Sequence, residues 1–285
     1  MRVSVVTPSF NLGYYLEDTV RSVIANLRPD DEYFIIDGGS TDNSVDVIRQ
    51  YESSITSWVS EHDAGYADAL AKGFARATGD ILCWINAGDL YLSGALDIAR
   101  QMLTADVDFV FGDDLYIDEK NRVLSYSNGW VPDLLTATLF GGWSPLQDAC
   151  FWRRSLYERA GGMNPKLQYA ADYDLFLRMS LVGRTRYVPV TFSAFRRHVG
   201  QKSVSGSSAY DVERKQVRAR ELREYKEYGE LQKKLRGGMF RLAMSARSRL
   251  APLVWRRPGV VGKQVLDLSC ASDWHRADRS CTNVG

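Results

Sequence analysis

The sequence of 285 residues is poor in cysteine and lacks long hydrophobic runs. Its four cysteines are too widely spaced for metal-type pairs or a dense disulfide framework, which predicts free thiols in a reducing cytosol: Cys83, Cys150, Cys270 and Cys281. No apolar run approaches the ~20 residues of a membrane span. The first predicted strand begins almost at Met1 and leaves no room for a signal peptide. These absences predict a cytoplasmic protein, soluble or peripheral at a membrane.

The sequence also lacks an excess of either charge. It has 36 Lys and Arg against 35 Asp and Glu, so its net charge is +1 and nothing points to a nucleic-acid partner. Its length fits one large α/β domain, or one domain with a helical appendix, and can bury a core without disulfides. Seven Trp and fifteen Tyr fit ordinary core packing or a sugar-binding cleft.

Strand and helix patterns alternate through the first half of the chain. Short apolar runs predict strands at 3–6, 33–36, 55–59 and 81–85. Apolar residues at helical spacing lie between them, as in 16–27 and 65–77. The second half predicts helices at 94–103, 155–160 and 172–181, strands at 109–111 and 184–190, and mixed signals over 121–142 that allow a hairpin. This order predicts an α/β fold with a mostly parallel sheet.

The character of the chain changes near residue 210. A charged helical run covers 211–235, and nine Lys or Arg but no Asp or Glu lie between Leu231 and Lys263. The segment 237–257 has the pattern of a basic amphipathic helix, which binds an anionic membrane surface or packs on the domain as a solvated helix. We therefore predict a globular domain over 1–209, a basic helical extension over 210–263 and an irregular tail over 264–285.

Polar residues follow three of the predicted strands. Ligands of open α/β sheets bind beyond the carboxyl ends of the strands, which here carry residues 7–11 (Thr-Pro-Ser-Phe-Asn), 37–42 (Asp-Gly-Gly-Ser-Thr-Asp) and 86–89 (Asn-Ala-Gly-Asp). Asp37 is able to accept a hydrogen bond from a base imide or a ribose hydroxyl, and the following glycines permit close approach. The alternative is a simple turn into a helix that is capped by Ser40 or Thr41.

Oxygen ligands such as Asp89, with Asn86 beside it, suit Mg²⁺ or Mn²⁺, which often take one or two carboxylates plus substrate phosphates. The alternative is a plain turn.

Asp68 and Lys72 lie one helical turn apart and form a surface pair or part of a site. The lone His198 is structural or a metal ligand.

Asp172 and Asp174 stand at the start of a predicted helix. Acids there complement the helix dipole, or one of them is a general base that deprotonates an acceptor hydroxyl. The dinucleotide-binding Gly-x-Gly-x-x-Gly pattern is absent, which disfavours an NAD-dependent oxidoreductase. Residues 7–10 are also a poor substitute for the Gly-rich, basic phosphate loop of a nucleotidyltransferase.

In this order, the motifs resemble those of the family 2 glycosyltransferases, over roughly residues 1–205. Residues 3–11 resemble the family's opening strand and loop, and 37–42 resemble its nucleotide-binding turn. Residues 86–89 stand in the place of its Asp-x-Asp metal motif, and 172–175 resemble the motif that supplies the base. The resemblance implies the GT-A fold, a nucleotide-sugar donor, a divalent cation and inversion at the anomeric carbon.

The resemblance also implies roles for single residues. A UDP-sugar donor would be held by Thr7, Pro8, Phe10, Asp37, Gly38, Ser40, Asp63, Asp68, Lys72 and Asn86. Asp89, helped by His198, would bind Mn²⁺ or Mg²⁺. Asp172 would be the base, and Gln147 and Asp174 would lie near a glycan or lipid-linked acceptor.

The chain departs from the family pattern at two positions. The first acid of the metal motif is Asn86, a neutral and weaker ligand, so metal affinity would depend more on bound diphosphate. The glutamate that usually precedes the base is Ala171, which makes Asp172 the only reasonable base. A non-catalytic nucleotide-sugar-binding module on the same fold is the alternative function.

Overall fold

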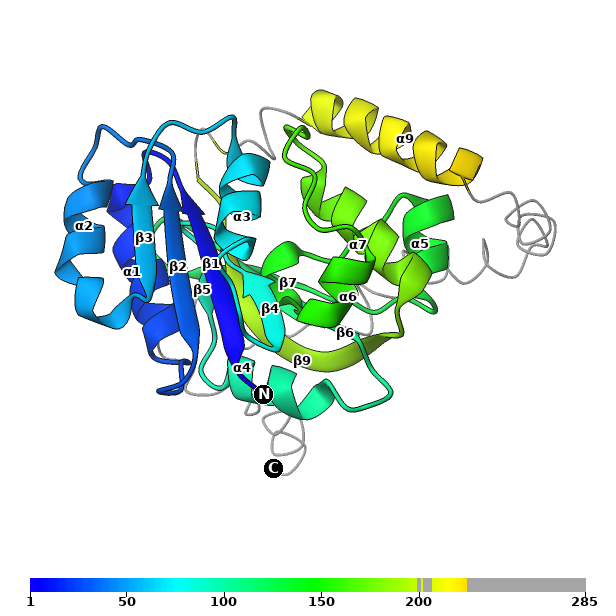
Figure 1. Cartoon of the computed structure of the whole chain (residues 1–285), viewed down its shortest axis with the longest axis horizontal. Coiled ribbons are helices and arrows are strands. Elements are labelled where there is room, and N and C mark those ends of the chain that lie inside the picture. Colours follow the sequence, from blue (N-terminus) through cyan, green and yellow to red (C-terminus); the bar gives the residue numbers. More distant parts are fainter. Residues whose placement is uncertain (199–200, 202–206, 225–285) are drawn as a thin grey trace, which may run out of the picture.

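The computed structural model describes residues 1–198, 201 and 207–224. The first half of the chain forms four parallel strands, in the order β3-β2-β1-β4 (Figure 1). They are β1 (Val3–Ser9), β2 (Glu32–Asp37), β3 (Ser57–Ser60) and β4 (Ile81–Trp84). The connecting helices are α1 (Gly13–Ile24), α2 (Ser44–Gln50) and α3 (Tyr66–Phe74), with a short 3-10 turn η1 (Glu52–Ser54). The predicted alternation is confirmed in this half.

The second half extends the same sheet and makes it mixed. The order continues β8-β6-β9-β5, and β7 pairs with β6. β8 is antiparallel to β4 and β6, β7 to β6 and β5 to β9, whereas β6 and β9 run parallel. The strands are β5 (Leu90–Tyr91), β6 (Phe109–Ile117), β7 (Val123–Ser127), β8 (Cys150–Arg153) and β9 (Thr185–Arg196). The stretch 121–142, for which the sequence allowed a hairpin, contains the strand β7, whose partner β6 lies before that stretch.

The remaining helices are α4 (Ala95–Met102), α5 (Leu134–Gly141), α6 (Arg154–Arg159), α7 (Ala171–Val182) and α9 (Ser207–Glu224), with a 3-10 turn η2 (Gln147–Ala149). Successive strand residues point to opposite faces of the sheet. Val5 accordingly packs with α1, α2 and α4, and Val6 packs on the other face with α3, α5, α6 and α7. Gly73 lets α3 approach closely, because a Cβ there would lie 2.4 Å from Val6 Cγ1.

α9 lies across α7 and α5 (Figure 1). Val217, which is 2% exposed, packs there against Leu139, Tyr173 and Leu177. The helix crosses the predicted boundary between residues 209 and 210, and that boundary stays a prediction. The segment 237–257 and the tail 264–285 lie outside the described residues.

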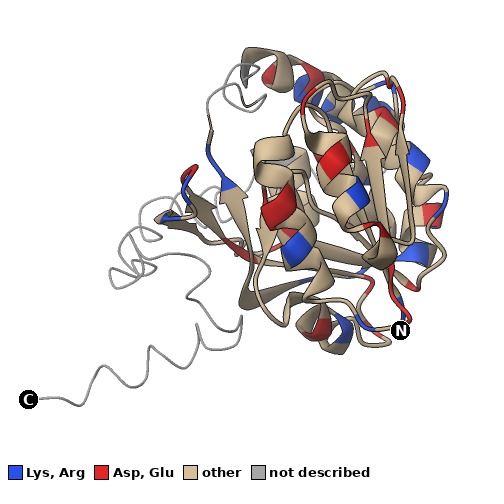
Figure 2. Ribbon diagram, turned by 90° about the vertical axis from the view of Figure 1, so that its left-hand side faces the viewer, with Lys and Arg blue, Asp and Glu red and all other residues tan. Residues whose placement is uncertain are grey.

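Acidic and basic residues are interspersed along the helices in Figure 2. Cys83 and Cys150 are buried free thiols, as predicted, and the other two cysteines lie outside the described residues. None of the helices described is long and apolar enough to cross a membrane.

Candidate active site at the carboxyl ends of the parallel strands

Hydrogen bonds join the loops that follow β1, β2 and β4. The amide of Gly38 donates to the Ser9 carbonyl (2.8 Å), and that of Ala87 donates to the Pro8 carbonyl (3.2 Å). The Ser9 hydroxyl is buried without a partner in the protein. The three predicted motifs therefore meet at one edge of the sheet, as the parallel strand order requires.

Asp37 organises the turn after β2. Its carboxylate, fully buried, accepts hydrogen bonds from the amides of Gly39 (3.2 Å) and Ser40 (2.8 Å) and from the hydroxyls of Ser40 (2.5 Å) and Ser60 (2.6 Å). Ser40 Oγ also accepts from the Asn11 amide (2.8 Å) and so ties this turn to the β1 loop. Asp37 and Ser40 thus support the turn, and their predicted contacts with a donor stay predictions.

The side chain of Thr7 points into the sheet, and its predicted contact with a donor stays a prediction. Its side chain is fully buried in the sheet. The hydroxyl of Tyr33 donates a hydrogen bond to Thr7 Oγ1 across neighbouring strands (3.1 Å). Thr7 therefore serves the core between β1 and β2.

Phe10 and Asp63 flank the junction of the β1 and β2 loops. Phe10 is 59% exposed, whereas Pro8 before it is buried. Asp63 lies over Gly38, where a Cβ would be 2.8 Å from Asp63 Oδ2. Asp63 Oδ1 accepts from the Gly65 amide (2.8 Å). An exposed aromatic ring and a carboxylate in this setting suit the stacking and hydrogen bonding of a nucleobase.

Lys72 forms ion pairs with two acids. Its Nζ lies 2.9 Å from Glu61 Oε1 and 3.4 Å from Asp68 Oδ2. These carboxylates, Glu61 first, raise the pKa of Lys72, so the amine is a fixed positive charge. The side chain of Lys72 is 28% exposed. The expected pair with Asp68 is confirmed, while its contact with donor sugar or ribose stays a prediction.

The loop of residues 86–89 turns Asp89 inward. Asp89 is 3% exposed, and it accepts from the Arg196 amide (2.9 Å) and from Gln147 Nε2 (3.3 Å). Burial, and then the nearby Asp148 carboxylate, raise the pKa of Asp89 well above its usual value. Asp89, the predicted metal ligand, is therefore hydrogen-bonded to Gln147, the predicted acceptor contact.

The predicted metal ligands around Asp89 do not form a site in which protein side chains alone would hold a cation. In the part of the chain that the structure describes, no three His, Cys, Asp or Glu residues gather closely enough to hold a metal ion. Asn86 is neutral, although its buried Oδ1 has no partner in the protein. The ring of His198 packs against Tyr15 at a tilt of 42°, with centroids 5.4 Å apart. A cation at this loop would take most of its ligands from a diphosphate and water.

Arg196 is a residue that sequence reasoning missed. Its Nε donates to the Gly88 carbonyl (2.7 Å), and its guanidinium lies 4.8 Å from the centre of the Tyr15 ring. Gly88 has φ 106°, a conformation that favours glycine. The available signal was a basic residue directly after residues 192–195, which are Phe-Ser-Ala-Phe.

Asp172 lies in the first turn of α7 and is partly buried. Burial raises its pKa to about 6, against the opposing effect of the Tyr173 amide, which donates to Oδ1 (2.7 Å). Near neutral pH this carboxylate is ionised and basic enough to accept a proton, which is what a general base requires.

Asp174 joins two helices, and its predicted place near the acceptor stays a prediction. It is fully buried. It pairs with Arg178, whose Nε lies 3.0 Å from Oδ2, and with Arg220 of α9. Its oxygens are therefore used to join α7 to α9.

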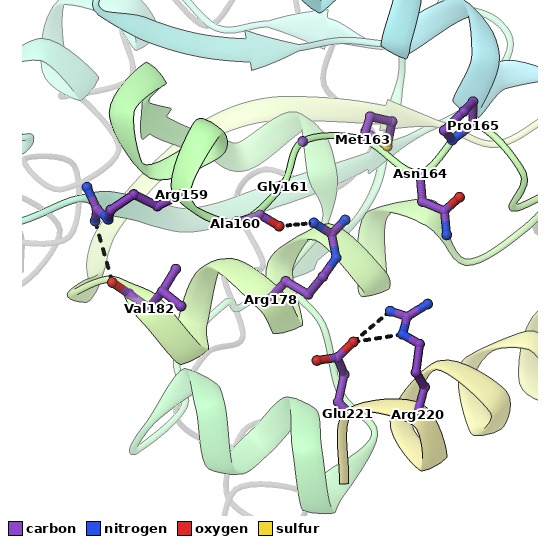
Figure 3. Close-up of a pocket in the computed structure, with 11 residues that line it drawn as sticks. Arg159, Ala160, Gly161, Met163, Asn164, Pro165, Arg178, Val182, Arg220 and Glu221 are labelled. Atoms are coloured by element: carbon purple, nitrogen blue, oxygen red, sulfur yellow. Dashed lines mark hydrogen bonds and ion pairs between the residues drawn. The ribbon is translucent and has the colours of Figure 1, made fainter. Parts of the chain in front are cut away.

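A pocket of about 480 Å³ opens between the α6–α7 loop, α7 and α9 (Figure 3). Arg178 donates there to the Ala160 carbonyl, and Arg220 bonds Glu221 (2.7 Å). None of the predicted donor-binding or catalytic residues lines it. The pocket is therefore separate from the site at the strand ends.

Comparison with known proteins gives a consistent result. Residues 4–160 match the family model described as glycosyl transferase family 2. An uncharacterized glycosyltransferase of Mycobacterium tuberculosis is 34% identical over 183 residues, which are 63% of this chain and 69% of that protein. A PGL/p-HBAD biosynthesis glycosyltransferase of Mycobacterium bovis is 28% identical over 207 residues, with 69% and 77% covered.

Two solved structures share the fold. S. aureus TarS 1–349 in complex with UDP-GlcNAc has a TM-score of 0.57 at 17% identity, with 72% of this chain and 61% of that chain covered. The mannosyltransferase PcManGT from Pyrobaculum calidifontis, in complex with GDP-Man and Mn²⁺, has a TM-score of 0.56 at 20% identity, with 71% and 59% covered. The chain thus spans less than two thirds of the length of both solved relatives.

Proposed function

The chain belongs to glycosyl transferase family 2, and we propose that it is an inverting glycosyltransferase. It would move a sugar from a nucleotide-sugar donor to a hydroxyl of a glycan or lipid-linked acceptor. The observation that carries this proposal is Asp172, a partly buried carboxylate whose pKa is raised to about 6. One such base is what a direct displacement needs.

The proposed reaction is a single displacement. Asp172 accepts the proton of the acceptor hydroxyl while the oxygen forms a bond to the anomeric carbon. The bond from that carbon to the diphosphate oxygen breaks, and the nucleoside diphosphate leaves with the bonding electrons. Attack from the side opposite the leaving group inverts the anomeric centre.

The donor is proposed to be a UDP-sugar. Phe10 would stack on the base, and Asp63 would accept a hydrogen bond from it. The S. aureus structure with UDP-GlcNAc supports this choice, while the Pyrobaculum structure with GDP-Man keeps GDP-sugars among the donors to test. Asp68 and Lys72 are proposed to lie near the sugar or ribose.

Mn²⁺ or Mg²⁺ is a proposed cofactor, supported by the Mn²⁺ in the solved mannosyltransferase. Asp89 and His198 remain its proposed protein ligands, and the cation would supply positive charge to the departing diphosphate. Because both oxygens of Asp89 already accept hydrogen bonds within the protein, these residues alone do not complete a cation site, and the diphosphate would supply further ligands.

We propose that the acceptor is an intermediate in the biosynthesis of a polysaccharide or a glycolipid. The name of the M. bovis relative, a PGL/p-HBAD biosynthesis glycosyltransferase, supports this class. Gln147 is kept as a proposed acceptor contact. The basic segment 237–257 would hold the enzyme at the inner face of the plasma membrane, where lipid-linked acceptors reside.

Release of nucleoside diphosphate from a panel of UDP-, dTDP- and GDP-sugars, with Mn²⁺ or with EDTA, tests the proposal. Water serves as the acceptor, so the unknown natural acceptor is not needed. We expect slow release from one donor class, with EDTA lowering the rate. Binding of a nucleotide without release from any donor would favour the non-catalytic module. Failure to bind any nucleotide would contradict the assignment.

A further inference from the structure

Glu213 of α9 accepts hydrogen bonds from the backbone immediately before α7. Its Oε1 accepts from the Gln168 amide (2.9 Å), and its Oε2 accepts from the amides of Tyr169 (2.7 Å) and Ala170 (2.6 Å). One carboxylate thus satisfies three successive N–H groups at the start of a helix, where negative charge is stabilised. Ala170 is the residue that precedes the first turn of α7.

Tyr66 of α3 holds the same backbone from the other side. Its hydroxyl donates to the Tyr169 carbonyl and accepts from the Ala171 amide, both at 2.9 Å. Residues 168–171 are therefore fixed from two helices that are far apart in the sequence. The next residue is Asp172, so these bonds set the position of its main chain.

α9 is itself firmly placed. Val217 is buried against α5 and α7, and Arg220 pairs with the fully buried Asp174. This helix lies beyond residues 4–160, which match the family model. The carboxylate of Glu213 thus belongs to a part of the chain outside the residues that match the family model.

We propose that Glu213 is a positioning residue for Asp172, which it holds in place through the backbone of residues 168–170. The proposal rests on the proposed function, in which Asp172 is the base. Glu213 does not touch the substrate; it fixes the turn from which the base projects. Small displacements of a base from its reacting atom are costly, by about 100-fold for about 1 Å.

Glu213 also acts on Asp172 by its charge. The groups that act on Asp172 are Glu213 and Tyr210 on α9, Tyr66 on α3, Asp174 on α7 and Cys150 on β8. After burial, the negative charges of Glu213 and Asp174 raise the pKa of Asp172. Removing the charge of Glu213 lowers that pKa, so the rate would begin to fall only at a lower pH.

The test measures nucleoside diphosphate release against pH for wild type, Glu213→Gln, Glu213→Asp and Asp172→Asn. Asp211→Asn is the matched control, because Asp211 is an exposed acid of the same helix that pairs with Arg214. We expect Glu213→Gln to lower kcat about 10- to 100-fold, to leave the donor KM unchanged and to move the acid limb to lower pH. Glu213→Asp shortens the side chain but keeps its negative charge. We therefore expect it to lower kcat and to leave the acid limb of the pH profile in place.

Circular dichroism and thermal unfolding give the folded fraction of each variant, and rates are compared per folded molecule. A loss of stability is then not mistaken for a displacement of Asp172. Wild-type kcat and an unmoved acid limb in Glu213→Gln would overturn the proposal, and so would an equal loss in Asp211→Asn. Full activity in Asp172→Asn, or no turnover by wild type, would instead refute the proposed function on which it rests.

Discussion

Arg196 has one of the largest side chains that the fold buries completely. A buried guanidinium is costly unless its donors are used. Besides the Gly88 carbonyl, it donates to Asp18 Oδ2 (3.1 Å) and to the Asp118 carbonyl (3.2 Å). One side chain therefore joins α1, the β6–β7 turn and the loop that carries Asp89.

Replacing Arg196 by Met should destabilise the protein. The change removes these bonds and leaves the Gly88 carbonyl unpaired, which should lower the free energy of unfolding by about 3 kcal/mol. Arg197→Met is the matched control, because that neighbouring guanidinium is exposed and lies 4.3 Å from the centre of the Tyr116 ring. Urea unfolding measures both, and equal midpoints for the two variants would contradict this account.

At the residue scale, the sequence located the site better than it assigned roles within it. The strand ends marked residues 37–42 and 86–89 because polar side chains after apolar runs are visible locally. The partners of Thr7 and Asp174, which are Tyr33 and Arg220, could not be predicted because they lie far along the chain. Local pattern gives the type of a side chain but not the group that it meets.

At the scale of elements, periodicity predicted the strands and helices of the first half. It missed α5, because residues 134–141 are apolar nearly all round and carry no helical period. It also gave no sign that β8 runs antiparallel between β4 and β6, since the direction of a strand depends on its connections. The charged run 211–235 predicted a helix, of which 211–224 lie in α9 and the rest lie outside the described residues. The docking of α9 on α7 depends on contacts with residues 168–178.

At the scale of the whole molecule, the small net charge is the sum of a basic stretch toward the C-terminus and an acidic remainder. Net charge is +1, yet nine Lys or Arg and no Asp or Glu lie between positions 231 and 263. The rest of the chain has 27 Lys and Arg against 35 Asp and Glu, a net charge of −8, which gives no general attraction to anionic surfaces. Any binding to an anionic membrane is therefore expected to come from 237–257.

Deleting residues 237–257 should release the protein from membranes. We expect the full chain to sediment with vesicles that contain anionic lipid, less so at high salt, because the attraction is screened. The variant should stay in the supernatant and keep its rate of donor hydrolysis. Deletion of 264–285 is the control and should leave sedimentation unchanged. Unchanged partitioning of the first variant would refute the proposed anchor.

The most direct test of the central claim is nucleoside diphosphate release by wild type and Asp172→Asn, from about pH 5 to about pH 8. The raised pKa of Asp172, about 6, predicts a wild-type rate that rises with pH and levels off above that value, as the base loses its proton. Asp172→Asn should be slower by about 100-fold or more at neutral pH and lack this rise. A variant with the wild-type rate and the same pH profile would contradict the assignment of Asp172 as the base.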